Sequence, residues 1–174
     1  YSFIFHAVES LIQRSPGKKI SLTLVGVKQE DLADELKKHP QLARLIRFTG
    51  YLNPDAVSKE IRGADLVLAP FLDGVTTRRG SVMTALEHGK VVITTFKSGA
   101  DTDSLPWKDF LDGVDVDLPQ ASAAYAEKVS EWAMVSLEQR ESMEVNARAF
   151  FLKKFSWQVI AEEYAKRLKA FSRS

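Results

Sequence analysis

Apolar residues recur at helical or strand spacing along most of the chain, and turn residues separate the segments. Ile4, Val8 and Leu11 are spaced as one face of a helix, and a Ser-Pro-Gly turn at 15–17 marks its end. Short apolar runs, which predict strands, then alternate with amphipathic segments, which predict helices. The predicted strands are 20–25, 45–49, 66–69 and 91–95.

The helices between these strands have recognisable ends. Asp31 is predicted to cap one helix, and Asn53 followed by Pro54 predicts the start of the next, because proline suits the first helical position. Ser81 is predicted to cap a third helix, which ends at Gly89.

The last third of the chain is predicted to be mainly helical. A short strand is expected at 114–118, and the helices at 120–174 are expected to pack on the rest of the domain. Trp132 and Trp157 fall in these helices, where core packing is the usual role of tryptophan, whereas Trp107 falls in a loop and could stack on a sugar. Two apolar stripes are predicted to be core: Ala126, Val129, Ala133 and Leu137, then Ile160, Ala161, Tyr164, Leu168 and Phe171.

The alternation of strands and helices predicts a doubly wound, Rossmann-like α/β fold with a parallel sheet. The length of 174 residues favours a single domain, 1–174. A domain of this kind begins with a strand, but this chain begins inside a helix. We therefore expect its first strand to be missing and the chain to be a fragment of a two-domain protein.

The composition excludes several classes of function. A net charge of +1 gives no field that would attract nucleic acid, and the absence of cysteine excludes disulfides and thiolate metal sites. His6, His39 and His88 have no recognised zinc spacing, so we expect no metal site. No apolar run approaches the length of a membrane span, so we expect a cytoplasmic protein that meets a membrane only through parts outside this chain.

The loop after the third predicted strand has the features of an anion site. Ligands of doubly wound folds bind beyond the carboxyl ends of the strands, and the loop between Asp73 and Ser81 leads directly into a helix N-terminus. Its glycines permit close backbone approach, and Arg78 and Arg79 could grip phosphate oxygens in pairs of hydrogen bonds. Both arginines could instead be solvated or paired with Asp73. Further donors would be the hydroxyls of Thr76, Thr77 and Ser81.

Three segments of the chain resemble the C-terminal domain of the retaining group 1 glycosyltransferases, which have the GT-B fold. They are Phe48-Thr49-Gly50-Tyr51, Ala64-Asp65-Leu66-Val67-Leu68-Ala69-Pro70 and Ala85-Leu86-Glu87-His88-Gly89 with the strand that follows. The resemblance extends over nearly the whole chain. Because each motif is short, the specificity lies in their order and spacing.

The resemblance implies that this domain binds the sugar donor, which is a UDP- or GDP-sugar, and that it uses no cofactor. Gly74, Arg79, Gly80 and Ser81 would cradle the diphosphate and the sugar, together with Asp73, Thr77 and Arg78. Tyr51 and Leu52 would lie near the base, and Gly26 would line the same cleft. The acceptor would bind to an N-terminal domain of the same protein, and this half alone would be nearly inactive.

The chain departs from the family at two glutamates that usually hold the sugar and the ribose. Thr84 occupies the place of the second, and the first has no clean match, with Asp73 or Thr76 nearest. Glu87 could compensate or could simply be an exposed helix residue. The sequence identifies no catalytic residue.

Two other functions remain open at the level of sequence. A sugar-nucleotide epimerase of the same fold would need an acid and base pair, and no convincing pair is apparent. A non-catalytic nucleotide-binding or scaffold domain could keep the fold and lose the ribose glutamate.

Overall fold

Five short strands form the framework of this computed structural model, which describes residues 1–98 and 111–171. They are β1 (Leu22–Leu24), β2 (Ile46–Phe48), β3 (Val67–Ala69), β4 (Val92–Phe96) and β5 (Leu111–Asp115). One sheet contains β1 and β2, the other has the order β3-β4-β5, and every pair is parallel. The predicted Rossmann-like class with parallel strands is therefore confirmed.

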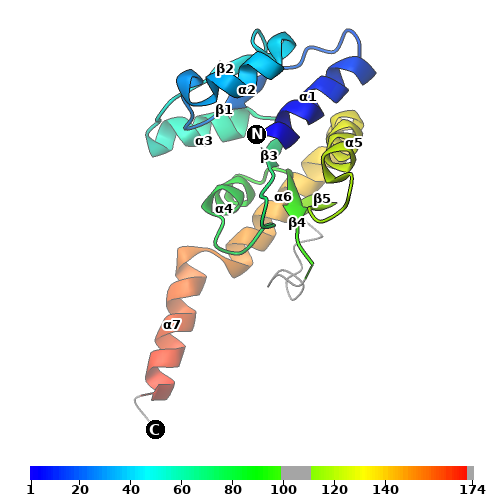
Figure 1. Cartoon of the computed structure of the whole chain (residues 1–174). Helices are drawn as coiled ribbons and strands as arrows, with labels where there is room; N and C mark the ends of the chain where they lie inside the picture. Colours follow the sequence, from blue (N-terminus) through cyan, green and yellow to red (C-terminus); the bar gives the residue numbers. More distant parts are fainter. Residues whose placement is uncertain (99–110, 172–174) are drawn as a thin grey trace.

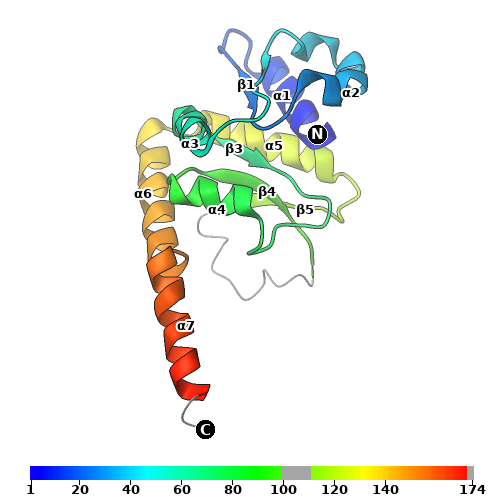
Figure 2. The same cartoon turned by 90° about the vertical axis from the view of Figure 1, so that its left-hand side faces the viewer.

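Helices connect the strands and cover them (Figure 1). They are α1 (Ser2–Arg14), α2 (Ala33–Lys38), α3 (Pro54–Gly63), α4 (Gly80–Glu87), α5 (Ala121–Met134), α6 (Leu137–Lys154) and α7 (Trp157–Phe171), with 3-10 turns η1 (Gln29–Leu32) and η2 (Pro40–Leu42). The sheet of β3, β4 and β5 has α4 and α6 on one face and α1 and α5 on the other (Figure 2). This is the two-sided cover that crossover connections produce.

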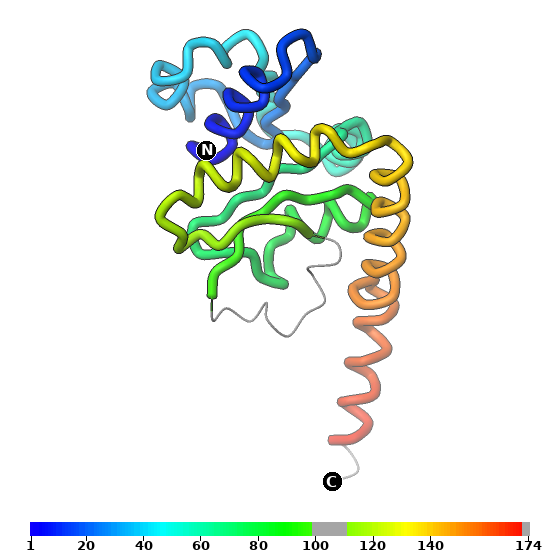
Figure 3. Tube along the Cα trace, turned by 90° about the vertical axis from the view of Figure 1, so that its right-hand side faces the viewer, coloured from blue at the N-terminus to red at the C-terminus, as the bar shows by residue number. Residues whose placement is uncertain are grey.

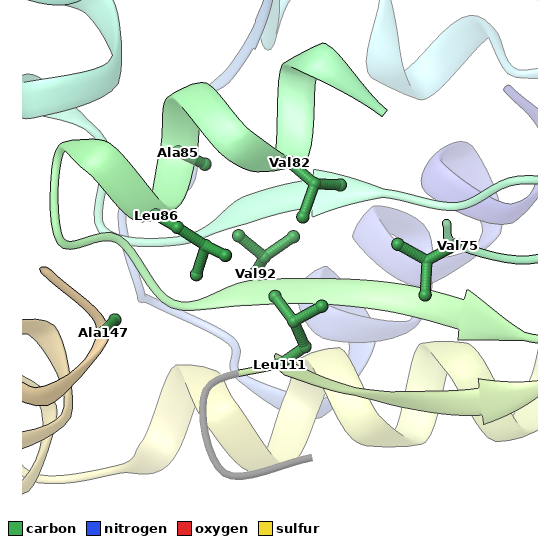
Figure 4. Packing of buried hydrophobic residues seen from close by; sticks show 7 residues of the cluster. All are labelled: Val75, Val82, Ala85, Leu86, Val92, Leu111 and Ala147. Carbon is green, nitrogen blue, oxygen red and sulfur yellow. The ribbon is translucent and has the colours of Figure 1, made fainter. Parts of the chain in front are cut away.

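The chain at β4 is buried on both faces because its side chains alternate. Val92 packs with Val82 and Leu86 of α4, as Figure 4 shows, whereas Ile93 points to the opposite face and packs with Tyr125 of α5. The Tyr125 hydroxyl donates to the Ile93 carbonyl oxygen at 2.8 Å, and burial raises the pKa of this phenol. The prediction of a central strand that is apolar on both faces is confirmed.

Two predicted helix ends are confirmed by their hydrogen bonds. The Asn53 side chain accepts from the backbone N–H of Ala56 at 2.9 Å, so it caps α3 as expected. Gly89 has φ +71° and follows α4, while the Lys90 N–H donates back to the Ala85 carbonyl at 2.9 Å. A side chain at Gly89 would also meet the Glu144 carbonyl of α6, so only glycine suits both the turn and the packing.

The predicted cap at Asp31 is wrong. This residue lies inside η1, where its N–H donates to the Lys28 carbonyl at 3.2 Å, and α2 begins at Ala33. Its carboxylate accepts from the Lys28 N–H at 3.2 Å, so it stabilises the start of the 3-10 turn from within. A polar residue before a helical pattern cannot tell these two positions apart.

The strand expected at 114–118 lies three residues earlier in the chain, at β5. Leu111 is buried and pairs with Val92, and Gly113 pairs with Thr94. A side chain at Gly113 would collide with the backbone of Thr94, so the strand passes through a glycine that local pattern marks as a turn residue.

The C-terminal stripes are only partly core. Trp132 packs on β4 as expected, but Leu137 does not continue the α5 stripe, because Ser136 accepts from the Gln139 N–H at 3.2 Å and starts a new helix. None of the α7 residues is buried: Trp157 is 86% exposed and Tyr164 is 67% exposed. The predictions that Trp157 and the stripe from Ile160 to Phe171 are core are therefore wrong. Trp107 lies outside the described residues.

Figure 3 shows why α7 stays exposed: it continues from α6 away from the sheets and projects from the body of the molecule. Its apolar residues are spaced as one helical face, so sequence periodicity cannot distinguish this stripe from a buried one.

We expect deletion of residues 156–174 to change the melting temperature by less than about 4 °C, because no residue of α7 is buried. In a domain of this size, a loss of about 1 kcal/mol in the free energy of unfolding lowers the melting temperature by about 2–4 °C. Thermal unfolding followed by circular dichroism measures this. As a control, Trp132→Ala should cost about 3–5 kcal/mol by opening a cavity. A fall of more than about 10 °C on deletion would contradict the expectation.

Candidate functional site

The loops at the carboxyl ends of β1 and β2 carry the first group of predicted site residues. Gly26 follows β1, and its N–H donates to the Thr49 hydroxyl oxygen at 3.1 Å, which ties it to the end of β2. Tyr51 and Leu52 come next along the chain after β2, and Tyr51 is 92% exposed. Gly26 and Tyr51 are thus exposed, and Leu52 is partly buried.

The second group follows β3. The loop between β3 and α4 contains Asp73, Gly74, Thr77, Arg78 and Arg79, and α4 contains Gly80, Ser81 and Thr84. In the part of the chain that the structure describes, no hydrogen bond or ion pair joins this group to Gly26, Tyr51 or Leu52. The predicted residues thus form two clusters, each at the carboxyl ends of parallel strands.

The start of the second loop is fixed by Thr95, a fully buried residue of β4. Its hydroxyl donates to the Phe71 carbonyl at 2.5 Å and accepts from the Phe71 N–H at 2.7 Å. Farther along, the Val75 N–H donates to the Thr95 carbonyl at 2.8 Å, and the Val75 side chain is completely buried. The loop is therefore held against β4 at two points. Sequence analysis missed this role, although a Thr-Thr pair ending an apolar strand was a visible signal.

Gly74 serves this packing and leaves no space for a side chain. With φ +76°, it lies so close to β4 that a side chain would meet the Lys97 backbone nitrogen at 2.8 Å. At Gly80, by contrast, a side chain would meet nothing within 4 Å. Close approach of a ligand to the backbone of Gly74 and Gly80 stays a prediction.

The N-terminus of α4 is open. Arg79 is the N-cap residue and makes no side-chain cap, so the predicted cap at Ser81 is wrong: Ser81 is the second residue of the helix. The N–H groups of Val82 and Met83 donate to the Arg79 carbonyl, which closes the first turn without a side chain. Within the described residues, the N–H groups of Gly80 and Ser81 have no partner. They are the two donors that α4 presents to solvent.

Arg79 lies between an aromatic ring and a carboxylate. Its guanidinium carbon lies 4.5 Å from the centre of the Phe71 ring, and Nη2 donates to Asp73 Oδ1. The alternative pairing of Arg79 with Asp73 is therefore confirmed. Asp73 has 72% of its side chain exposed, so the pair is worth only about 0–1 kcal/mol. Among the described residues, the buried Nε of Arg79 has no hydrogen-bond partner, which leaves part of the guanidinium unsatisfied.

The other polar residues of the loop are more exposed. In the described structure, Arg78 forms no ion pair, and its backbone N–H is 3.4 Å from the Thr76 hydroxyl, its acceptor. Thr77 is exposed. The Thr84 hydroxyl donates to the Gly80 carbonyl at 2.9 Å, so its hydrogen is used inside α4. Arg78 is thus the cation beside the helix N-terminus with no partner among the described side chains.

The remaining polar candidates stabilise the fold. Asp65 lies at the amino end of β3 and pairs with Arg140 of α6 at 2.9 Å. His88 caps the C-terminus of α4: Nδ1 donates to the Thr84 carbonyl at 2.7 Å, and in the neutral ring Nε2 accepts from the Ser58 hydroxyl at 2.6 Å. Both lie at the ends of their elements that face away from the loop.

The order of these elements and the placement of the loop match a known family. Residues 1–132 match the sequence model of the family described as glycosyl transferases group 1. The chain belongs to this glycosyltransferase family. No curated protein matches the sequence.

The fold of this group 1 domain is shared with a solved structure, sucrose-phosphate synthase from Thermosynechococcus elongatus. The TM-score is 0.69 at 15% sequence identity, and the match covers 98% of this chain. It covers 43% of the other chain, so this chain spans less than half the length of that protein.

In this glycosyltransferase domain, Thr84 occupies the place of a family glutamate, and Glu87 is the nearby residue that could compensate. Thr84 faces the helix backbone, as its bond to Gly80 shows. Glu87 is exposed at the opposite end of α4 from the loop, where its carbonyl accepts from Arg148. Glu87 is thus exposed, as our second interpretation expects, and its replacement of the family glutamate stays a prediction.

Among residues 1–98 and 111–171, no cluster of histidine and carboxylate side chains is arranged to bind a metal ion. In the same residues, each helix is too short or too polar to cross a bilayer.

We expect Thr95→Val to destabilise the domain by about 1–3 kcal/mol, because this change of similar shape leaves two partly buried backbone groups of Phe71 without a partner. Urea unfolding measures the free energy of unfolding. Thr94→Val is the matched control: Thr94 is equally buried but makes one hydrogen bond, to the Ala69 carbonyl at 2.7 Å. Equal losses in the two variants would contradict the role of Thr95.

Proposed function

We propose that this chain is the donor-binding half of a group 1 glycosyltransferase and that it binds the diphosphate of a UDP- or GDP-sugar at the start of α4. The observation that carries the proposal is the pair of open N–H groups at Gly80 and Ser81, next to two arginines at the carboxyl end of a parallel sheet. Family membership of residues 1–132 supports the same assignment.

The charges at this point favour a diphosphate. A helix N-terminus carries about half a positive charge, and the α4 dipole points toward the open loop. Arg78 adds a guanidinium with no partner among the described residues, and Arg79 adds a second that Phe71 holds in place. Because a nucleoside diphosphate gains charge as it leaves the sugar, donors fixed in advance would stabilise the transition state.

Asp73 would compete with a diphosphate for the Arg79 guanidinium. It accepts from Arg79, so a diphosphate must displace it or share the guanidinium. The carboxylate is mostly exposed and can turn into solvent at little cost. Arg79 would thus exchange one anionic partner for another and stay over the Phe71 ring.

The nucleoside would lie toward the first cluster. Tyr51 exposes nearly all of its ring beyond β2, and an aromatic face of this kind can stack on a base. Gly26 and Leu52 would border the same surface. This part of the proposal rests on the family resemblance, because the described residues provide no direct link between the two clusters.

The acceptor would be bound by another part of the protein, an N-terminal domain. The candidate site is an open surface, with Leu72 79% exposed. A glycosyl donor must be shielded from water during transfer, so a second domain would have to close over this surface. We infer that the chain alone binds a donor and transfers sugar poorly.

The loop composition favours transfer over epimerisation. Residues 71–81 contain one carboxylate, Asp73, and it is paired with Arg79. An acid and base pair would need two groups with opposite roles.

The test is titration calorimetry of the chain with UDP, GDP, uridine, guanosine and inorganic phosphate. Arg79→Ala should weaken the diphosphonucleotide about tenfold or more, because a charge-assisted hydrogen bond is worth about 1.5–3 kcal/mol, and should leave the nucleoside unchanged. Tyr51→Ala should weaken nucleoside and diphosphonucleotide by similar factors. Asp73→Asn should strengthen diphosphate binding by removing the competitor.

Arg167→Ala is the matched control, since this arginine pairs with Glu163 on the projecting α7 and should have no effect. The proposal fails if neither diphosphonucleotide binds, or if Arg79→Ala and Arg167→Ala behave alike. Equal affinity for inorganic phosphate and UDP would reduce the site to a general anion site.

A further inference from the structure

A tight turn fixes the backbone of Asp73. The Gly74 N–H donates to the Phe71 carbonyl at 3.1 Å, which closes a turn with Asp73 in its centre. Both sides of this turn are bonded to Thr95 of β4. The Thr95 hydroxyl exchanges two hydrogen bonds with the backbone of Phe71, and the Thr95 carbonyl accepts from the N–H of the residue after Gly74. The side chain of Asp73 can therefore turn, but its backbone stays in place.

The Asp73 carboxylate lies between Arg79 and solvent. It accepts from Nη2 of Arg79, and 72% of the side chain is exposed. The Arg79 guanidinium is held independently, because its central carbon lies 4.5 Å from the centre of the Phe71 ring. When the carboxylate turns away from Arg79, the guanidinium can thus stay over the ring. The negative charge moves by no more than the length of one aspartate side chain.

The other charges of the loop are positive. Residues 71–81 contain Arg78 and Arg79 but no carboxylate besides Asp73, and the N-terminus of α4 adds the positive end of a helix dipole. Lys97 borders the turn, since a side chain on Gly74 would collide with it, and its Nζ lies 3.7 Å from an exposed carboxylate of Asp117. Without Asp73, the loop itself would therefore present only positive charge to a ligand.

The donor and the product of a sugar transfer differ in charge at the phosphate. In a nucleoside diphosphate sugar, the terminal phosphate is a diester with one negative charge. When the bond between the sugar carbon and the phosphate oxygen breaks, the oxygen keeps the electron pair, the sugar bonds to the acceptor oxygen, and the acceptor proton is released. The free terminal phosphate loses its second proton near pH 6, so at pH 7 the product carries about one more negative charge than the donor. A purely positive site would therefore favour the product over the donor.

We propose that Asp73 is the residue that offsets this preference: its carboxylate weakens binding of the free nucleoside diphosphate more than binding of its sugar ester. This inference rests on the proposed function of the loop. A carboxylate that cannot leave the site repels each ligand in proportion to the charge of that ligand. After transfer, Asp73 also returns to Arg79 and takes the place of the departing diphosphate. The pair thus limits retention of the product.

Titration calorimetry at pH 7 and low salt tests this discrimination, because salt screens charge effects at an exposed site. The ligands are UDP, UDP-glucose and the β-methyl ester of UDP, which has the charge of a donor but no sugar, and the corresponding GDP series with GDP-mannose. Asp73→Asn should strengthen binding of the free diphosphate about three- to tenfold more than binding of either ester, as expected for one extra charge a few ångströms from a carboxylate. Stopped-flow measurement should show slower release of the free diphosphate from this variant.

Two variants serve as controls. Asp73→Glu keeps the charge and should keep the discrimination of the unmodified chain. Glu163→Gln also removes an exposed carboxylate that pairs with an arginine, at 3.2 Å from Arg167, but it lies on the projecting α7. It should leave the relative affinities of the three ligands unchanged.

The outcomes separate this inference from the proposed function. If neither UDP nor GDP binds to the unmodified chain, the proposed function fails and the inference fails with it. If a diphosphate binds but Asp73→Asn changes all three ligands of the series by the same factor, the inference is overturned and the proposed function stands. The inference is also overturned if the variant weakens only the sugar ester and leaves the methyl ester level with the free diphosphate, because Asp73 would then act by contacting the sugar.

Discussion

The geometry of the candidate site depends on the buried hydroxyl of Thr95. By donating to and accepting from the backbone of Phe71, it holds the first residue of the loop against β4 in a place where water cannot replace it. Val75 then inserts into the core and bonds to the Thr95 carbonyl. With the loop fixed at both points, the chain reaches α4 in one orientation, and the helix opens toward the loop side of the sheet.

On the loop side of the sheet the backbone is fixed, whereas the charged side chains can change partners. Phe71 is fixed by Thr95 and in turn supports the Arg79 guanidinium, whereas the partner of Arg79, Asp73, is exposed and free to turn. The buried, unsatisfied Nε of Arg79 indicates that its present hydrogen bonds do not use the whole guanidinium. In the proposed function, this site would be set in position before a ligand arrives and would still exchange its counter-ion.

The described residues leave two kinds of surface exposed, a pair of strand edges and a helix face. β1 and β3 leave backbone groups unpaired on facing edges, and α7 carries an apolar stripe that no described residue buries. Exposed edges and stripes of this type are costly in an isolated protein.

The amino-acid sequence by itself determined the order of strands and helices, the doubly wound class and the position of the loop between β3 and α4. These depend on local patterns: the β-branched run at β4, the Asn53-Pro54 start of α3 and the glycine after α4 all act within a few residues. The motif order that marks the glycosyltransferase family is equally a property of the sequence. The prediction of an anion site in the loop also rests on its residue types, and both the site and its ligand stay predictions.

Only the tertiary structure decided where the local patterns apply. Gly74 and Gly113 are both glycines because neighbouring backbone fills the space of a side chain, which no nearby residue in the sequence reveals. The stripes of α5 and α7 have the same periodicity, but one packs on β4 and the other projects into solvent. The pairing of Arg79 with Asp73 and the role of Thr95 likewise depend on contacts between elements. Burial is set by what lies opposite a residue in space, and sequence spacing along one element contains no information about that partner.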